Sequence, residues 1–157
     1  MRHFFSMVLV VILLASITPL AVADRAMMYN DVRANPSDNV DNPFDLSTAN
    51  YSAPFAFKEY SATMAIGYES NVTFSLNSTY INFSSSASVP VYIKAYYWNG
   101  SSWISAYSKT INVDKTATDY GPYTITGLSS GKPFYIRLSK TQYSGYKCIG
   151  TIVVEGN

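Results

Sequence analysis

Residues 89–113 read VPVYIKAYYWNGSSWISAYSKTINV and contain the strongest local folding signal in the chain. Two long stretches rich in β-branched and aromatic residues, 89–98 and 103–113, flank the sequence Asn-Gly-Ser-Ser. Asn-Gly tolerates positive φ and therefore reverses a strand at low cost. We predict a β-hairpin here, with Trp98 opposite Trp103.

The alternation of side chains gives the two faces of this hairpin different chemistry. A half-buried strand directs apolar residues inward and polar residues outward, so we assign the more apolar face to the core. That face carries Val91, Ile93, Ala95, Tyr97, Ile104 and Ala106. In an unbroken register, the opposite face pairs Tyr96 with Ser105, Lys94 with Tyr107, and Tyr92 with Lys109.

We predict that this second, aromatic and cationic face binds the ligand. Its candidate binding residues are Trp98, Trp103, Tyr96, Tyr92, Tyr107, Lys94 and Lys109. Tyr and Trp combine an apolar ring with a polar tip, which suits the apolar face of a sugar or a protein surface. The lysines add contacts to anionic groups. The alternative interpretation is ordinary cross-strand pairing, which stabilises a sheet by about 0.2–1 kcal/mol per pair.

The rest of the chain after Tyr51 also has the composition of strands. Val, Ile, Thr, Tyr and Phe are frequent there, and no segment shows a convincing helical apolar stripe. Further strands are predicted at 55–64, 71–77, 79–84, 122–126, 133–140 and 147–155, the last as an exposed edge strand. Many short, closely spaced strands predict an all-β fold, a single antiparallel β-sandwich.

One segment has a family resemblance. The sequence YTITGL at 123–128, followed by Gly131 and by FYIRL at 134–138, resembles the E–F region of a fibronectin type III domain. Phe134 stands where that family has a tyrosine, and Ser129 stands where it has a proline. The resemblance implies an immunoglobulin-like or fibronectin-like sandwich, and it implies nothing about function.

The N-terminal residues predict export. A basic start at Arg2 and His3, an apolar run and the small-x-small sequence Ala-Val-Ala at 21–23 are typical of a secretory signal peptide over residues 1–23. Residues 24–49 are rich in Asn, Asp and Pro, which favours a flexible arm. Within the arm, residues 44–46 are expected to dock on the domain. The β-sandwich domain is then 50–157, and the protein is expected to be secreted.

Composition argues against several kinds of chemistry. His3, the only histidine, lies in the predicted signal peptide, so Ser-His-Asp and Cys-His catalysis are excluded from the mature chain. Cys148 is the only cysteine, which excludes an internal disulfide and favours a small buried residue. The sequence contains no cluster of Lys and Arg residues of the kind that nucleic-acid binding requires. After residue 23 the sequence has no run of about 20 apolar residues, so we do not expect a membrane anchor. We expect no cofactor and no metal.

These observations favour a small secreted noncatalytic binding module whose partner is an extracellular glycan or protein surface. The first alternative is a structural subunit that associates with itself through exposed edge strands. The weakest alternative is a hydrolase that uses paired carboxylates drawn from Glu59, Glu69, Asp114, Asp119 and Glu155. The acidic stretch 38–45 is either a solvated linker or a calcium site, and its spacing does not match an EF-hand loop.

Overall fold

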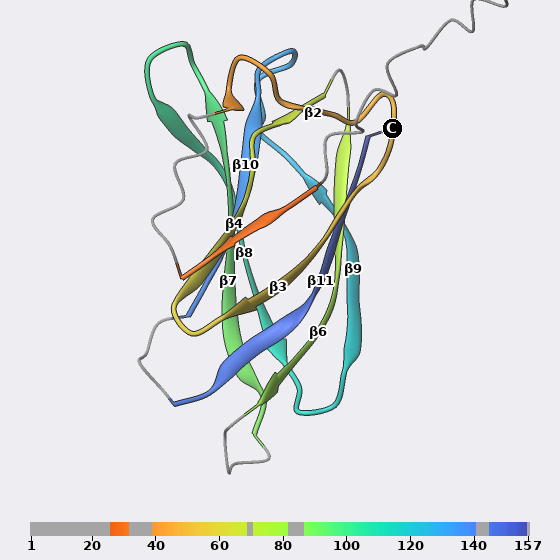
Figure 1. The fold of residues 1–157 in the computed structure, drawn as a ribbon, viewed down its shortest axis with the longest axis vertical. Coiled ribbons are helices and arrows are strands. Elements are labelled where there is room, and N and C mark those ends of the chain that lie inside the picture. Colours follow the sequence, from red (N-terminus) through yellow and green to blue (C-terminus); the bar gives the residue numbers. More distant parts are fainter. Residues whose placement is uncertain (1–25, 32–38, 69–70, 82–86, 141–144, 157) are drawn as a thin grey trace, which may run out of the picture.

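β-Strands form nearly all of the regular structure in the described part of the chain (Figure 1). The computed structural model describes residues 26–31, 39–68, 71–81, 87–140 and 145–156, and these residues contain no α-helix. The all-β prediction is therefore confirmed. The predicted signal peptide lies outside the described residues. The strands are β1 (Met28–Asn30), β2 (Phe44–Asp45), β3 (Tyr51–Phe57), β4 (Tyr60–Thr63), β5 (Ile66–Gly67), β6 (Val72–Ile81), β7 (Val89–Trp98), β8 (Trp103–Val113), β9 (Thr118–Ile125), β10 (Phe134–Ser139) and β11 (Lys147–Gly156).

The strands form two sheets. In sheet A, β8, β7 and β10 are neighbours in that order, and β4 and β5 both pair with the other side of β10. The short strands β1 and β2 extend this sheet by pairing with β4 and β5. Sheet B has the order β3-β11-β6-β9. Every pair is antiparallel except β2 with β5.

The order of the strands differs from the predicted immunoglobulin-like or fibronectin-like order. In the immunoglobulin order the last two strands share a sheet as neighbours. Here β10 lies in sheet A, whereas β11 lies in sheet B between β3 and β6. The prediction that residues 147–155 form an exposed edge strand is also wrong, because β11 is hydrogen-bonded on both sides. Among the described strands, those that pair on one side only include β8 at one end of sheet A, and β3 and β9 at the two ends of sheet B.

The hairpin strands coincide with their predicted bounds, and other boundaries change. The predicted strand 55–64 is two strands, because the chain reverses at Lys58 and Glu59 and crosses from sheet B to sheet A. The carboxylate of Asp31 holds this turn by accepting the backbone N–H groups of Lys58 and Glu59 at 2.7 Å each and that of Tyr60 at 3.3 Å. The predicted strands 71–77 and 79–84 form one strand as far as Ile81, and residues 82–84 lie outside the described residues.

The core lies between the inner faces of the two sheets. Alternate residues of β6, β7, β10 and β11 are buried, as the period-two pattern predicts. The largest fully enclosed side chains are Tyr51, Phe57, Ile66, Phe74, Leu76, Tyr80, Ile93, Phe134, Ile136, Leu138 and Ile152. The predicted core face of the hairpin is confirmed for Val91, Ile93 and Ala95. It is wrong for Ile104 near the tip, which is 37% exposed.

Two segments of the predicted N-terminal arm take part in the sheets. Residues 28–30 pair with β4, and the Asn30 side chain accepts hydrogen bonds from the Ala56 N–H and the Ser61 hydroxyl. Phe44 and Leu46 are both 7% exposed and belong to the core, which matches the docking expected for residues 44–46. Burying side chains of this size contributes about 1.5–3 kcal/mol each. The folded unit therefore includes strands that precede residue 50.

Candidate functional site

The aromatic side chains that face outward from a sheet are concentrated on sheet A. On β7, residues 92, 94, 96 and 98 alternate with buried ones and point away from the core. On β10, Tyr135 and Arg137 do the same. Neighbouring strands bring these side chains into rows, because Tyr96 is directly opposite Tyr135.

Four rings form a continuous group, which we call the aromatic cluster: Trp98, Trp103, Tyr96 and Tyr135. Tyr96 and Tyr135 are stacked, with ring centroids 4.9 Å apart and an interplanar angle of 11°. Trp103 meets Tyr135 edge-on at 4.8 Å, and Trp98 lies 5.2 Å from Trp103. The Trp98–Trp103 pairing predicted from the hairpin is confirmed. These contacts hold the rings in fixed positions, since aromatic pairs favour stacked or edge-on geometry.

A β-bulge in β8 removes two predicted residues from this face. The pairing shifts between Ala95 and Tyr96, which leaves Ala106 as the extra residue. A shift of one residue turns every later side chain to the other face of the sheet. Tyr107 therefore lies opposite Ala95 and meets the buried ring of Phe74 edge-on at 6.1 Å.

Lys109 is turned inward by the same bulge. Its Nζ lies 4.2 Å from the centroid of the Tyr123 ring, on β9 of the other sheet. The predicted pairs of Lys94 with Tyr107 and of Tyr92 with Lys109 are therefore wrong.

The cationic part of the face is formed by Lys94 and Arg137. These residues are directly opposite each other on β7 and β10, one row from the stacked tyrosines. The guanidinium of Arg137 lies 4.6 Å from the centroid of the Tyr60 ring, a cation–π contact that fixes its position. Tyr92 occupies the next row, opposite Ser139.

Sequence reasoning missed two contributors, Tyr135 and Tyr60. The alternation of residues 134–138 already places Tyr135 and Arg137 on the outward face. Their partners depend on the pairing of β10 with β7, which joins segments far apart in the chain and has no local signal.

The hydroxyl of Tyr135 stays protonated over the physiological range. Burial and the neighbouring Tyr96 raise the pKa of Tyr135 to about 12, and the charge of Arg137 opposes this shift. A protonated phenol both donates and accepts hydrogen bonds. The aromatic cluster therefore offers apolar ring surface together with a neutral polar group.

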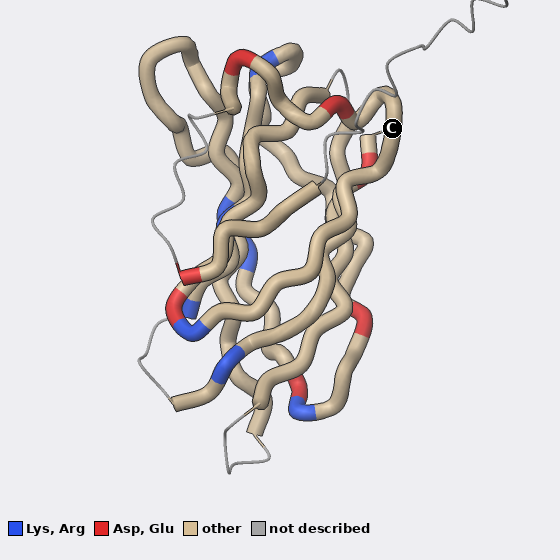
Figure 2. The backbone as a smooth tube through the Cα atoms, in the orientation of Figure 1, with Lys and Arg blue, Asp and Glu red and all other residues tan. Residues whose placement is uncertain are grey.

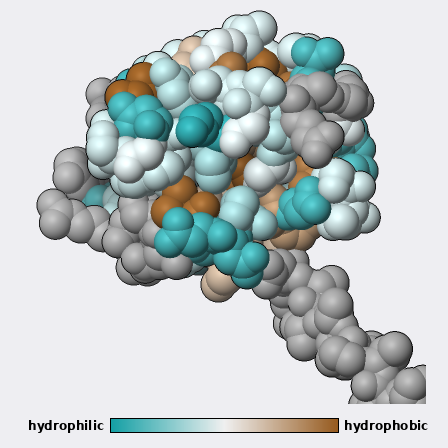
Figure 3. Space-filling model, turned by 90° about the horizontal axis from the view of Figure 1, so that it is seen from above, coloured by the Kyte–Doolittle hydropathy of each residue, from teal (hydrophilic) through white to brown (hydrophobic). Residues whose placement is uncertain are grey.

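The outer face of sheet B has a different character. Small and polar side chains are the most frequent on it, among them Ser52, Thr73, Ser75, Asn77, Thr79 and Thr151, and the apolar residues there, such as Ile81, Ile149 and Val153, are aliphatic. In the part of the chain that the structure describes, no aromatic residue of sheet B alternates outward. Viewed from above, the surface shows hydrophobic residues only in small separate patches (Figure 3). The two faces of the molecule therefore offer different surfaces to a partner.

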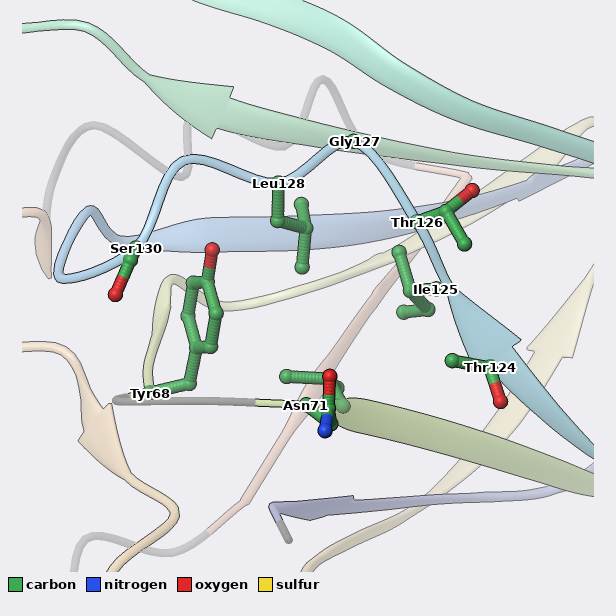
Figure 4. A pocket seen from close by; sticks show the side chains of 9 residues that line it. Tyr68, Asn71, Thr124, Ile125, Thr126, Gly127, Leu128 and Ser130 are labelled. Atoms are coloured by element: carbon green, nitrogen blue, oxygen red, sulfur yellow. The ribbon is translucent and has the colours of Figure 1, made fainter.

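A pocket of about 380 Å³ lies away from the aromatic cluster, under the loop that joins β9 to β10 (Figure 4). Tyr68 points into it from one wall, and Leu128 and Ser130 lie on the opposite side. The Tyr68 hydroxyl is enclosed without a hydrogen-bond partner in the described residues, and its ring packs edge-on against Phe134 at 5.2 Å. Asn71, Thr124 and Thr126 are the other polar side chains of the lining. Among the described residues that line the pocket, there is no acid–base pair.

The carboxylates proposed for a hydrolase lie on separate elements. Glu155 on β11 accepts a hydrogen bond from Asn50 at 2.7 Å, and Asp119 on β9 accepts one from Asn77 at 2.6 Å. Glu59 lies in the turn between β3 and β4, and Glu69 lies outside the described residues. Across the described ranges, no group of three His, Cys, Asp or Glu side chains is arranged to hold a metal ion. Over the same ranges, no helix has the length and apolar character that crossing a bilayer requires.

No protein-family model matches the chain, and no curated protein or solved structure shows significant similarity to it.

Proposed function

We propose that the protein is a small secreted noncatalytic binding module and that it binds a glycan through the aromatic cluster on sheet A. The observation that carries this proposal is the fixed group of partly exposed rings formed by Trp98, Trp103, Tyr96 and Tyr135. Flat rings offer apolar surface to sugar rings, and the tyrosine hydroxyls and tryptophan N–H groups offer hydrogen bonds to sugar hydroxyls.

The winding of the chain supports a binding role. Strands β3, β4 and β6 to β11 can be numbered one to eight along the chain. Sheet B then has the order first, eighth, third and sixth. The main part of sheet A has the order second, seventh, fourth and fifth. We propose that this is a jelly roll rather than an immunoglobulin-like or fibronectin-like sandwich. Jelly rolls occur in lectin domains and also in proteins of other functions, so the winding supports the proposal and the aromatic cluster carries it.

The proposal is tested by binding and stability measurements on the same variants. Trp103→Ala and Tyr135→Ala are each expected to weaken binding to a polysaccharide panel by at least about tenfold, because each removes stacking surface from the binding face. Their unfolding free energies should fall by about 1–3 kcal/mol, because each ring makes two aromatic contacts of about 0.5–1.5 kcal/mol each. Ile81→Ala is the control, since Ile81 is 40% exposed at the end of β6 on sheet B.

The outcome that contradicts the proposal is equally direct. If Trp103→Ala and Tyr135→Ala bind every polysaccharide as the unmodified protein does and lose only stability, the rings are cross-strand pairs of the sheet and nothing more. A panel that includes neutral and acidic polysaccharides is needed, so that a charge preference is not mistaken for absence of binding.

A second candidate function is self-association through strand edges. It is favoured by β8 and β9, which each pair on one side only among the described strands and lie next to each other along the chain. An unpaired edge is a template for pairing with another copy. Sedimentation equilibrium over a wide concentration range tests this candidate, and a monomer throughout would remove it.

A further inference from the structure

Charge is distributed unevenly between the two sheets. Strands β4, β7, β8 and β10 of sheet A contain Lys94, Lys109 and Arg137 and no carboxylate, and Asp45 on the short strand β2 is the carboxylate of this sheet's strands. The acidic residues lie mostly in turns and at strand ends (Figure 2). Since Lys109 is turned inward, Lys94 and Arg137 remain as the cations of the outer face.

These two cations lie in a position that is unfavourable for the sheet itself. Like charges directly opposite each other on neighbouring strands destabilise the pair. Neither Lys94 nor Arg137 forms an ion pair with a carboxylate of the described residues, and the enclosed Nε of Arg137 has no hydrogen-bond partner there. An anionic ligand would relieve this repulsion, whereas a neutral one would not.

The two cations lie close to the aromatic cluster on the same strands. Lys94 and Arg137 lie two residues from Tyr96 and Tyr135 along the same strands, which corresponds to about 7 Å. A polymer chain that contacts the rings can therefore also reach the two cations. The Tyr60 ring holds the Arg137 guanidinium in place. A guanidinium fork matches the oxygens of a carboxylate or sulfate group.

We propose, on the basis of the proposed glycan binding, that the ligand is an acidic polysaccharide. Its sugar rings lie on the aromatic cluster, and its carboxylate or sulfate groups bind Lys94 and Arg137. The rings provide contact area that does not depend on charge, and the two cations provide the preference for an anionic chain. Because exposed charges are screened, this preference decreases as the salt concentration rises.

The test uses pairs of polymers that differ in charge alone. Polygalacturonate is compared with its fully methyl-esterified form, and dextran sulfate is compared with dextran, by affinity electrophoresis and calorimetry on the full chain. At least one anionic polymer is expected to bind about tenfold or more tightly than its neutral partner, the size expected for charge-assisted hydrogen bonds. The pair that shows the difference tells carboxylate from sulfate recognition.

Variants then assign the preference to the two cations. Lys94→Gln and Arg137→Gln are each expected to reduce binding of the anionic polymer by about tenfold and to leave the neutral polymer unchanged. Lys94→Gln is also expected to raise the Tm of the unliganded protein by about 1–3 °C, because it removes a like-charge pair. The exposed Lys115, in the turn after β8, gives the matched control Lys115→Gln.

The possible failures are distinguishable. If neutral and anionic polymers bind equally and Trp103→Ala abolishes both, the glycan proposal stands and the acidic preference is overturned. If no polymer binds, both are overturned. If polyglutamate binds as tightly as polygalacturonate, and Trp103→Ala does not weaken either, the site recognises charge on any chain and the polysaccharide assignment is wrong.

Discussion

The backbone of Gly127 packs against the carbonyl oxygen of Ala106, so closely that a Cβ at position 127 would lie 2.9 Å from that oxygen. Ala106 is the extra residue of the β8 bulge, and Gly127 lies in the loop that carries the chain from sheet B to sheet A. The loop therefore packs on the bulge that decides which side chains of β8 face outward. The bulge and the loop that follows β9 are therefore in direct contact, outside the aromatic cluster.

Gly127→Ala is expected to destabilise the protein by about 2–3 kcal/mol, because it adds both left-handed strain and a clash with the Ala106 backbone. Gly127 has φ +78°. The matched control is Gly131→Ala, since Gly131 has φ +68° and no atom within 4 Å of its added Cβ. That variant should lose only about 1 kcal/mol. Urea unfolding measures both, and equal losses would show that the contact with Ala106 imposes no constraint.

Gly150→Ala is expected to be the most damaging single methyl addition in the sheets. Gly150 lies in the middle of β11, and its added Cβ would collide with the backbone oxygen of Asn77 and lie 2.9 Å from the Phe55 ring. Since β11 is paired on both sides, neither neighbour can move without breaking a ladder, and a loss above about 3 kcal/mol is expected.

The control for this variant is Gly156→Ala, at the end of the same strand, where the nearest atom is the Leu46 Cβ at 3.2 Å. It should reduce stability far less in thermal unfolding. A Gly150→Ala protein with an unchanged Tm would mean that the strands separate more easily here than the geometry implies.

Local sequence information was sufficient for the hairpin and for most strands, and it failed where distant segments decide the outcome. Alternation located β7, β10 and β11, because one face of each is buried, and the Asn-Gly turn located β8. Which strands become neighbours is set by packing between segments far apart in the chain, so the position of β11 between β3 and β6 had no local signal.

The candidate site was predicted in part for the same reason. The Asn-Gly turn fixed Trp98 against Trp103, but the unbroken register assumed for the rest of the hairpin placed Tyr107 and Lys109 on the wrong face. Gly127, from another part of the chain, packs against the extra residue of this bulge, Ala106. Tyr135 joined the site through the pairing of β10 with β7, again a contact between distant segments.

Asp31 gives an expected pH dependence. Its partial burial raises the pKa, but the backbone N–H groups of Glu59, Lys58 and Tyr60 and the charge of Lys140 lower it more, so the pKa lies below its usual value. A lowered pKa in the folded state means stabilisation that is present above the unfolded pKa and lost as the pH falls through the folded one. We expect unfolding free energy to decrease in acid for this reason.

Asp31→Asn should remove that part of the acid dependence and destabilise the protein at pH 7, because an amide accepts these hydrogen bonds more weakly than a carboxylate. Asp41→Asn, at an exposed turn position, is the control. Denaturant titrations between about pH 2.5 and pH 7, around the ordinary Asp pKa, compare the three proteins. If Asp31→Asn follows the same acid curve as the unmodified protein, the carboxylate does not hold the turn.

Cys148 is expected to make the unfolding free energy decrease as the pH rises in the alkaline range. It is fully buried on β11, opposite Phe57 and Tyr80. Burial raises the pKa of its thiol to about 11, and the charge of Lys140 opposes the shift. The folded protein therefore holds this proton more tightly than the unfolded chain does. Its contribution to stability is complete below the unfolded pKa of about 8.5 and is lost as the pH rises toward the folded value.

Cys148→Ala is expected to flatten the decrease of unfolding free energy between about pH 9 and pH 11, because it removes the thiol that titrates differently in the two states. The tyrosines and lysines that also titrate there are common to both proteins and cancel in the difference. At pH 8 the folded protein should react with a thiol reagent far more slowly than the protein in guanidinium, since a buried neutral thiol is a poor nucleophile. Rapid labelling of the folded protein would mean that the strands around Cys148 open readily and that the core is looser than its packing indicates.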